Sequence, residues 1–263
     1  MIVVIGATGN VGRPLLAALP DARPVSRRTG ADLADPASLR PAFAGAEALF
    51  LMVPGAGGHL DTPAILGEAS AAGIKRIVLL SSQAAGTRPG WPSHAPLRTL
   101  EDRVKDAVPS WTVLRPGGFA SNAFGWAESV RAGRTVAAPY ADVALPIVDP
   151  DDIAAVAAAA LLDERHAGRT YVLTGPEATT PRQRAQAIGE AIGAPVEFVE
   201  QSPEEARAQL LGFMPEVVAD GTLAILGTPE PQERAVSPDV ERVLGRPAGT
   251  FAAWARRNAA AFR

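Results

Sequence analysis

The chain contains no cysteine, and it has only two tyrosines and three histidines. Without cysteine it can form no disulfide, no thiolate metal site and no cysteine nucleophile, which fits a reducing compartment. The apolar stretch 153–162 is about half as long as a membrane-spanning helix, so it predicts a buried helix. Because the first predicted strand begins at Ile2, we expect no secretion signal and a cytoplasmic protein.

Several function classes also lack their sequence signatures. The net charge of -3 comes without a basic patch, so we expect neither nucleic acid nor a membrane as a partner. We find no clustered metal ligands, no Gly-x-Ser-x-Gly elbow and no Gly-Lys-Ser/Thr phosphate loop. The sequence therefore favours a chain without a metal that acts on a small molecule.

Short β-branched segments alternate with longer Ala/Leu-rich segments along the first half of the chain. The β-branched segments are almost continuously apolar, as strands are when helices cover both faces of a parallel sheet. The predicted strands are Ile2–Ile5, Arg23–Ser26, Ala48–Val53, Arg76–Ser81, Trp111–Arg115 and Thr170–Thr174. The predicted helices between the strands include Val11–Leu19, Pro36–Phe43, Thr62–Ala72, Pro96–Ala107 and Phe119–Ala132. This alternation predicts an α/β fold with a doubly wound parallel sheet.

A glycine-rich loop follows the first strand directly and leads into a helix. The loop reads Gly6-Ala7-Thr8-Gly9-Asn10-Val11-Gly12. Gly6 and Gly9 leave space for a pyrophosphate, and Gly12 lets the helix approach the sheet. The first gap is one residue longer than in the common Gly-x-Gly-x-x-Gly pattern. An ordinary tight turn is the alternative, but the position between strand and helix favours a Rossmann-type dinucleotide site.

The end of the second predicted strand indicates which nucleotide binds. It reads Ser26-Arg27-Arg28, where NAD-binding proteins usually carry an acid. Guanidinium groups form paired, charge-assisted hydrogen bonds with a phosphate monoester such as the 2′-phosphate of NADPH. The pattern favours NADPH over NADH, with solvated loop arginines as the alternative.

The regular alternation ends after Gly133, where turn-rich sequence begins. We therefore expect residues 1–133 to form the NAD(P)-binding domain, with residues 145–175 returning to it. Residues 134–144 and 176–263 would form a smaller C-terminal substrate lobe. A monomer or weak homodimer is the expected assembly.

The sequence resembles the NmrA-like NAD(P)H-binding group of the atypical short-chain dehydrogenase/reductase superfamily, which includes NADPH:quinone reductases. The resemblance rests on GATGNVG, Ser26-Arg27-Arg28, Asp32-Leu33, Ser81-Ser82, WTVLRPGGFASN (111–122) and PIVDPDDIA (146–154). It covers roughly the first 160 residues, and the C-terminal lobe carries no comparable motif.

The resemblance implies the cofactor contacts. Pyrophosphate contacts fall to Thr8, Asn10 and Val11, and Arg27 and Arg28 would read the 2′-phosphate. Asp32 and Leu33 would border the adenine. The residues implied around the nicotinamide are Val53, Pro54, Ser81, Ser82 and the segment Pro116, Gly117 and Phe119.

The chain departs from many short-chain dehydrogenases at the proton donor. These enzymes use a Tyr-x-x-x-Lys pair, but Ala144 follows Tyr140 at that spacing and Gly175 follows Tyr171. His94 lies where that pair would be, and it is our candidate acid, with Ser82 as the second catalytic candidate. A helix cap or a packed surface residue is the alternative for His94. We expect Glu101 to be structural and give His59 and His166 weaker claims, although His59 could touch substrate.

Hydride acceptors that form stabilised anions need no strong protein acid. The missing pair therefore favours an NADPH-dependent oxidoreductase acting on a quinone, enone or imine. The alternative is a non-catalytic NADP-sensing regulator that acts through a protein partner. A closed apolar pocket lined by Phe119, Phe124, Trp126 and Phe213 would favour the enzyme, whereas core packing is the plain interpretation of these aromatics.

Overall fold

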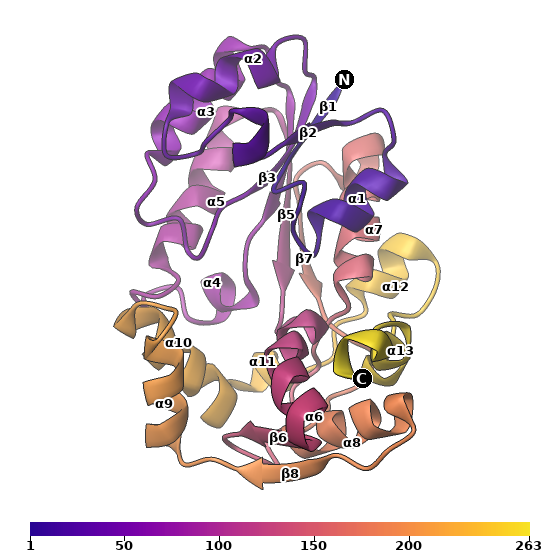
Figure 1. Ribbon diagram of the computed structural model, residues 1–263. Coiled ribbons are helices and arrows are strands. Elements are labelled where there is room, and N and C mark those ends of the chain that lie inside the picture. The colour runs from indigo at the N-terminus through magenta and orange to yellow at the C-terminus, as the bar shows by residue number, and fades with distance from the viewer. The chain divides into compact units, whose positions relative to one another are not determined.

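A computed structural model describes residues 1–263, which divide into two compact units (Figure 1). The first unit comprises Met1–Pro116, Pro150–Leu173 and Asp239–Arg246. The second comprises Gly117–Asp149, Thr174–Pro238 and Pro247–Arg263. The chain therefore leaves the first unit after Pro116 and returns to it twice.

The first unit is built around a six-stranded sheet in which every pairing is parallel. Its order is β2-β1-β3-β4-β5-β7, so the strand order reverses between β1 and β3. The strands are β1 (Ile2–Ile5), β2 (Arg23–Val25), β3 (Ala48–Met52), β4 (Arg76–Leu80), β5 (Ser110–Pro116) and β7 (Arg169–Leu173). This topology confirms the predicted doubly wound α/β fold, whose ligands bind at the carboxyl ends of strands near such a reversal.

Helices cover both faces of this sheet, which is why its central strands are almost wholly apolar (Figure 1). On one face lie α1 (Gly12–Ala18), α7 (Pro150–Leu162) and α12 (Asp239–Leu244). On the other lie α2 (Arg40–Phe43), α3 (Thr62–Ala71) and α5 (Ala95–Ala107), and the short α4 (Gln83–Thr87) follows β4.

Two predicted helices are interrupted. The segment 36–43 forms a 3₁₀ turn, η2 (Pro36–Leu39), before α2, whose first turn contains Pro41. Proline lacks the N–H that would continue the helical hydrogen bonds, so the pattern changes at this residue. The segment 119–132 likewise begins as the 3₁₀ helix η3 (Ala120–Trp126) and becomes α-helical only in α6 (Ala127–Gly133).

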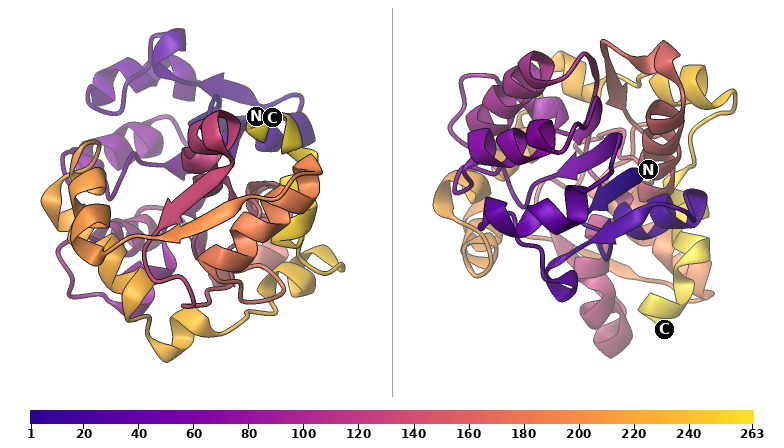
Figure 2. Two further views of the ribbon diagram at one scale, coloured as in Figure 1. Left: turned by 60° about the horizontal axis from the view of Figure 1, so that its bottom comes forward. Right: turned by 90° about the horizontal axis from the view of Figure 1, so that it is seen from above.

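The second unit contains a two-stranded parallel sheet that the sequence patterns did not predict. Its strands are β6 (Thr135–Ala138) and β8 (Glu197–Glu200), which lie side by side in Figure 2. Its helices are α6, α8 (Pro181–Ile192), α9 (Pro203–Leu211), α10 (Glu216–Gly227), α11 (Pro231–Arg234), α13 (Phe251–Arg257) and the 3₁₀ segment η5 (Ala259–Phe262). Trp254 and Phe262 are buried in its core. No helix of the chain combines the length and apolar character that a membrane span requires.

Candidate cofactor and active site

The glycine-rich loop closes into a tight turn directly after β1. Gly6 has a φ of 78°, and its N–H donates to the Val25 carbonyl at 3.2 Å. The Gly9 N–H donates to the Gly6 carbonyl at 2.9 Å. Left-handed backbone conformations of this kind favour glycine, so β1 can turn here without a side chain in the way.

Close packing excludes side chains at two of the three glycines. A Cβ on Gly6 would lie 2.2 Å from Sδ of Met52, and a Cβ on Gly12 would lie 2.1 Å from the Gly6 carbonyl oxygen. No side chain caps the start of α1, and its first turn contains no acid. The turn therefore brings the uncapped start of α1 close to the end of β1, as a pyrophosphate site requires.

A cavity of about 690 Å³ opens beside this turn, at the carboxyl ends of β1, β2 and β3. Its volume lies within the range of small-molecule and cofactor sites. Eight of the residues predicted to hold the cofactor line it: Gly6, Thr8, Gly9, Arg27, Arg28, Asp32, Leu33 and Pro54. Segments far apart in the sequence thus converge where a doubly wound fold binds a dinucleotide.

The two arginines of the cavity are held in place by the backbone around them. They begin the 3₁₀ turn η1 (Arg27–Thr29), where the Ser26 N–H donates to the Thr29 hydroxyl at 3.0 Å. That hydroxyl donates to the Ser26 carbonyl at 2.7 Å. Arg27 and Arg28 are both exposed and form no ion pair, so their guanidinium groups can bind a phosphate.

The acidic residue of the cavity shapes the loop that contains it. The Asp32 carboxylate accepts the Ala34 N–H at 3.0 Å, and the Asp32 N–H donates to the Ser38 hydroxyl at 2.9 Å. Leu33 packs against the core beneath the sheet's carboxyl edge. Asp32 therefore fixes the loop conformation, and Leu33 gives the cavity an apolar wall.

His59 lines the same cavity as Arg28 and Asp32, two residues predicted to bind the adenosine part of the cofactor. Met52 and Leu60 also line it, and the sequence analysis missed both. Met52 is the last residue of β3. Because ligands bind at the carboxyl ends of the strands, its position in the predicted strand could have identified it as a lining residue. Leu60 lies two residues after the glycine-rich segment 55–58, and no sequence pattern identified it as a lining residue.

A buried network joins three of the chain's segments beside β4. Ser81 donates to Oε1 of Glu101 at 2.6 Å, and Glu101 has no exposed surface. Arg115 donates to the same carboxylate from Nε at 2.9 Å and from Nη2 at 2.6 Å. The expectation that Glu101 is structural agrees with this arrangement, because its oxygens are occupied by protein donors.

Ser82, the second catalytic candidate, occupies the N-cap of α4. Its hydroxyl oxygen accepts the Ala84 N–H at 3.3 Å. The hydroxyl proton is not used by this contact, so Ser82 can still donate a hydrogen bond. Ser81 and Ser82 therefore differ, since only the proton of Ser81 is committed to a carboxylate.

His94 occupies the N-cap position of α5 but does not cap that helix with its side chain. Its Nδ1 lies 2.9 Å from the Ser93 hydroxyl, and the residue is half-buried. Arg98, one turn later, pairs with Asp102 at 3.2 Å. The serine contact orients the ring, as a second group commonly does for a histidine that transfers protons.

The chain continues from β5 into the second unit through Pro116 and Gly117. Phe119 pairs with Val148 through backbone hydrogen bonds that flank it, both 2.8 Å long. Phe124 packs against Trp254 and Phe262, with ring centroids 5.0 and 6.0 Å apart, so core packing accounts for this aromatic residue. Phe213, in contrast, is 69% exposed. Of the predicted pair Val53 and Pro54, only Pro54 lines the cofactor cavity, and Val53 is buried.

Tyr171 and Lys105 have partners away from the cofactor cavity, and Lys75 lies at the opposite edge of the sheet. Tyr171 bonds to Nδ1 of His166 at 2.8 Å, and burial raises its pKa above the usual range. Lys105 pairs with Asp102 at 3.2 Å and lies over the Trp111 ring. Lys75 directly precedes β4 and therefore lies at the amino edge of the sheet.

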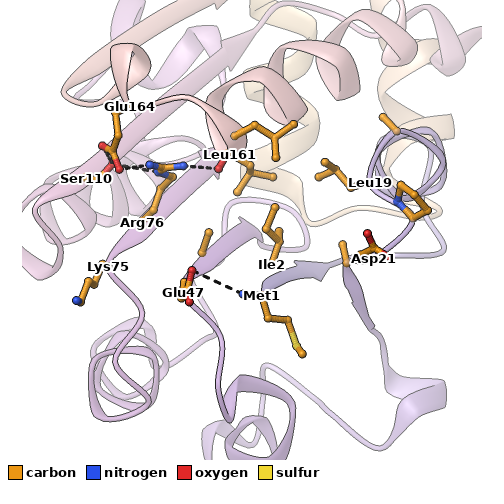
Figure 3. Close-up of a pocket in the computed structure, with 15 residues that line it drawn as sticks. Met1, Ile2, Leu19, Asp21, Glu47, Lys75, Arg76, Ser110, Leu161 and Glu164 are labelled. Carbon is orange, nitrogen blue, oxygen red and sulfur yellow. Dashed lines mark hydrogen bonds and ion pairs between the residues drawn. The ribbon is translucent and has the colours of Figure 1, made fainter.

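A second pocket, of about 660 Å³, lies at that amino edge and contains none of the predicted site residues (Figure 3). Leu161 and Leu19 form part of its apolar lining. Arg76 also lines it and donates to Glu164 and to the Leu161 carbonyl. These partners occupy the Arg76 guanidinium, and the pocket lacks the glycine-rich turn and every other predicted cofactor residue, so we assign the site to the carboxyl edge.

Comparisons with known proteins agree with this architecture. The chain is 36% identical to the (4-alkanoyl-5-oxo-2,5-dihydrofuran-3-yl)methyl phosphate reductase of Streptomyces griseus, over 100% of this chain and 99% of that one. It is 32% identical to an NAD(P)H azoreductase of Xenophilus azovorans, again over 100% and 99% of the two chains. Among solved structures, an NADPH-dependent quinone oxidoreductase of Escherichia coli in complex with NADPH has a TM-score of 0.81 at 24% identity, covering 98% and 99%.

The family assignment rests on a longer stretch than the motifs alone. Residues 29–228 match the NmrA-like family, which extends the similarity well into the second unit. Two relatives above 30% identity also align over the entire chain. The protein is therefore a member of the NmrA-like family.

Proposed function

We propose that this protein is an NADPH-dependent reductase of small, conjugated organic acceptors such as quinones, enones or imines. The observation that carries the proposal is the cavity lined both by the glycine-rich turn and by two arginines that form no ion pair. The chain is an oxidoreductase, as its full-length reductase relatives are, and NADPH is its cofactor. The proposal adds the class of acceptor, a conjugated organic molecule, to this activity and cofactor.

The cavity residues divide the work of holding the cofactor. The turn from Gly6 to Gly12 takes the pyrophosphate, and Arg27 and Arg28 take the 2′-phosphate. When bound, NADPH supplies a hydride from its nicotinamide ring. The protein's contribution is then positioning, which can lower a barrier by about 7–11 kcal/mol without any protein acid.

The arrangement of possible acids supports acceptors that form stabilised anions. Neither lysine lies at the carboxyl edge, and the Tyr171 hydroxyl is bonded to His166. An unactivated ketone needs a strong proton donor as it takes up hydride, whereas a quinone gives an anion that water can protonate. The site is therefore suited to conjugated acceptors.

His94 and Ser82 are the proposed proton-handling groups. Histidine is the side chain best suited to proton transfer near neutral pH, and the Ser93 hydroxyl orients the ring of His94. Ser82 retains its hydroxyl proton because the N-cap contact uses only its oxygen. We assign to them the protonation of acceptors whose anions are less stabilised than those of quinones.

The names of the relatives point in the same direction. The Streptomyces relative is named for an unsaturated lactone that carries a phosphate, and the Xenophilus relative is named for azo compounds. A triphenylmethane reductase of Citrobacter sp. shares the fold, with a TM-score of 0.77. Each of these acceptors has an electron-poor conjugated system that accepts hydride.

The proposal is tested by following NADPH oxidation with a panel of quinones, enones, azo dyes and cyclic imines, and with saturated ketones as unactivated controls. NADPH binding is measured in parallel by its fluorescence. Turnover of at least one conjugated acceptor, with saturated ketones inert, is the expected result. Tight NADPH binding without turnover of any acceptor would contradict the proposal and favour a cofactor-sensing regulator.

A further inference from the structure

Trp91 is the most exposed of the chain's four tryptophans, with 38% of its surface accessible. Trp111 and Trp126 are half-buried, and Trp254 is buried. Trp91 lies in the first unit, in the connection between α4 and α5. A single exposed aromatic residue is common on protein surfaces, so the position of this one and the contacts that hold it decide its meaning.

Both the backbone and the ring of Trp91 are held in place. Its N–H donates to the Arg88 carbonyl at 3.0 Å, and its carbonyl accepts the N–H groups of His94 at 2.9 Å and Ala95 at 2.8 Å. The Arg88 guanidinium carbon lies 4.4 Å from the centroid of the indole, and Arg88 is buried. No aromatic ring and no second cation contacts the indole, so its stacking capacity is used on one face only.

The backbone bonds of Trp91 join it to the proposed proton donor. His94 is the N-cap of α5 and Ala95 is its first residue, so the Trp91 carbonyl closes the turn that starts this helix. Ser93 is buried in the same turn, and its hydroxyl lies 2.9 Å from Nδ1 of His94. One hydrogen-bonded turn therefore carries both the indole and the imidazole.

The segment 91–96 also contacts the loop that lines the cofactor cavity. A Cβ on Gly58 would lie 3.2 Å from Cγ of Pro96, the second residue of α5. The residue after Gly58 is His59, which lines the cavity. Towards the amino terminus, α4 connects the segment to its N-cap Ser82, which we expect beside the nicotinamide. The segment is thus linked to both predicted parts of the cofactor site within the first unit.

We propose that Trp91 is the residue against which a planar, conjugated acceptor stacks while it receives hydride. Aromatic rings favour offset-stacked contacts, and an electron-poor ring system lies favourably on the electron-rich face of an indole. Tryptophan offers a large contact area at a low cost in conformational entropy, and the Arg88 contact restricts the ring further. This inference rests on the proposed reductase function, and it narrows the acceptor to a flat, extended ring system rather than a compact enone.

The first experiment compares naphthoquinone with cyclohexenone at saturating NADPH. Trp91→Leu should raise KM for naphthoquinone about tenfold, because it removes the stacking surface and keeps an apolar side chain. KM for cyclohexenone, which has no extended ring system, should change little, and so should kcat for both acceptors. Trp91→Phe should restore part of the lost affinity. An unchanged KM for naphthoquinone in Trp91→Leu, or equal rises for both acceptors, would overturn the proposal.

Trp111→Leu is the matched control. Trp111 also lies against a cation, with Nζ of Lys105 at 5.5 Å from its ring centroid. It is the second residue of β5, so it lies at the amino edge of the sheet, away from the cofactor cavity. This variant should leave both KM values unchanged, which separates the loss of a stacking surface at Trp91 from the loss of a tryptophan elsewhere.

A second measurement does not depend on turnover. With NADP⁺ in place of NADPH no hydride is available, so calorimetry can measure the binding of naphthoquinone itself. The unmodified protein and Trp111→Leu should bind it with the same Kd, and Trp91→Leu should bind it about tenfold more weakly. If no acceptor is reduced but this difference is observed, the proposed reductase activity fails while the stacking site stands. Equal Kd values in Trp91→Leu and the unmodified protein, or no binding by the unmodified protein, would refute the site itself.

Discussion

The Ser81 hydroxyl donates to Glu101 at 2.6 Å, and this bond commits the serine's only side-chain proton to a fully buried carboxylate. Ser81 can therefore accept hydrogen bonds from a ligand but cannot protonate one. Its neighbour Ser82 keeps its proton. Of these two adjacent serines, only Ser82 can therefore donate a hydrogen bond to a ligand.

Glu101→Gln should destabilise the protein, because it leaves the Arg115 guanidinium without its anionic partner. Breaking a buried ion pair on one side costs about 3 kcal/mol. Urea denaturation followed by circular dichroism measures this loss. Arg98→Gln is the control, since Arg98 lies 3.6 Å from Glu101 and is 38% exposed. The control should lose less than about 1 kcal/mol, and equal effects in the two variants would show that the Arg115 pair is not the stronger one.

Arg27→Ala and Arg28→Ala should each weaken NADPH binding while leaving NADH binding nearly unchanged. A charge-assisted hydrogen bond contributes about 1.5–3 kcal/mol, which is roughly tenfold or more in Kd. Fluorescence titration with both nucleotides separates the 2′-phosphate contribution from the rest. Arg13→Ala, a nearby arginine of α1 outside the cavity lining, is the control. Parallel losses for NADPH and NADH would contradict the assignment of the 2′-phosphate to these residues.

Gly12→Ala should disturb the turn, because the new Cβ would lie 2.1 Å from a backbone oxygen that cannot rotate away. Overpacking of this kind costs about 1–3 kcal/mol, and NADPH affinity should fall with it. The matched change is Gly67→Ala in the interior of α3, where a Cβ meets nothing within 4 Å. That variant should be stabilised by about 0.5–1 kcal/mol. Thermal unfolding and NADPH titration of both variants measure these changes. An unchanged Tm and NADPH affinity in Gly12→Ala would contradict the close packing of this turn.

Stability should fall as the pH drops below about 6.5. Burial first, and Arg165 second, lower the pKa of His166 below its ordinary value of 6.5, while Asp163 has a weaker opposing effect. The unfolded chain therefore binds a proton more readily than the folded protein, and acid favours unfolding. His166→Phe should flatten the slope between pH 7 and 5, whereas His59→Gln, at an exposed histidine, should not. An unchanged slope in His166→Phe would assign the effect to another group.

His94→Gln should separate the acceptor classes. With a quinone, kcat should fall less than threefold, because water can protonate the product anion. With an enone, whose anion is less stabilised, the loss should reach about a hundredfold. Steady-state kinetics at saturating NADPH give both values. A large and equal loss with both acceptors would show that His94 positions the cofactor instead.

The sheet was predictable because its strands are buried on both faces. Five of its strands lie within one or two residues of their predicted bounds, and β1 matches its prediction fully. The small β6–β8 sheet was missed because its strands are short, half-exposed and far apart in the sequence. Apolar periodicity carries little information about such strands.

The candidate site likewise has a part that local sequence patterns predict and a part that they do not. The loop from Gly6 to Gly12 and the pair Arg27 and Arg28 are local patterns, and the structure gathers most of these residues around one cavity. The bond between Ser81 and Glu101 joins residues 20 positions apart through the packing of α5, which no local pattern encodes.

Every residue that lines the cofactor cavity falls between Ile5 and Leu60. Less than a quarter of the chain, in one uninterrupted stretch, therefore encodes this cavity. Mutations after residue 60 can therefore change the predicted contacts of the nicotinamide and the acceptor while the lining of this cavity stays the same. Such a separation lets a family explore new chemistry by drift in one region of the gene while selection holds the other constant.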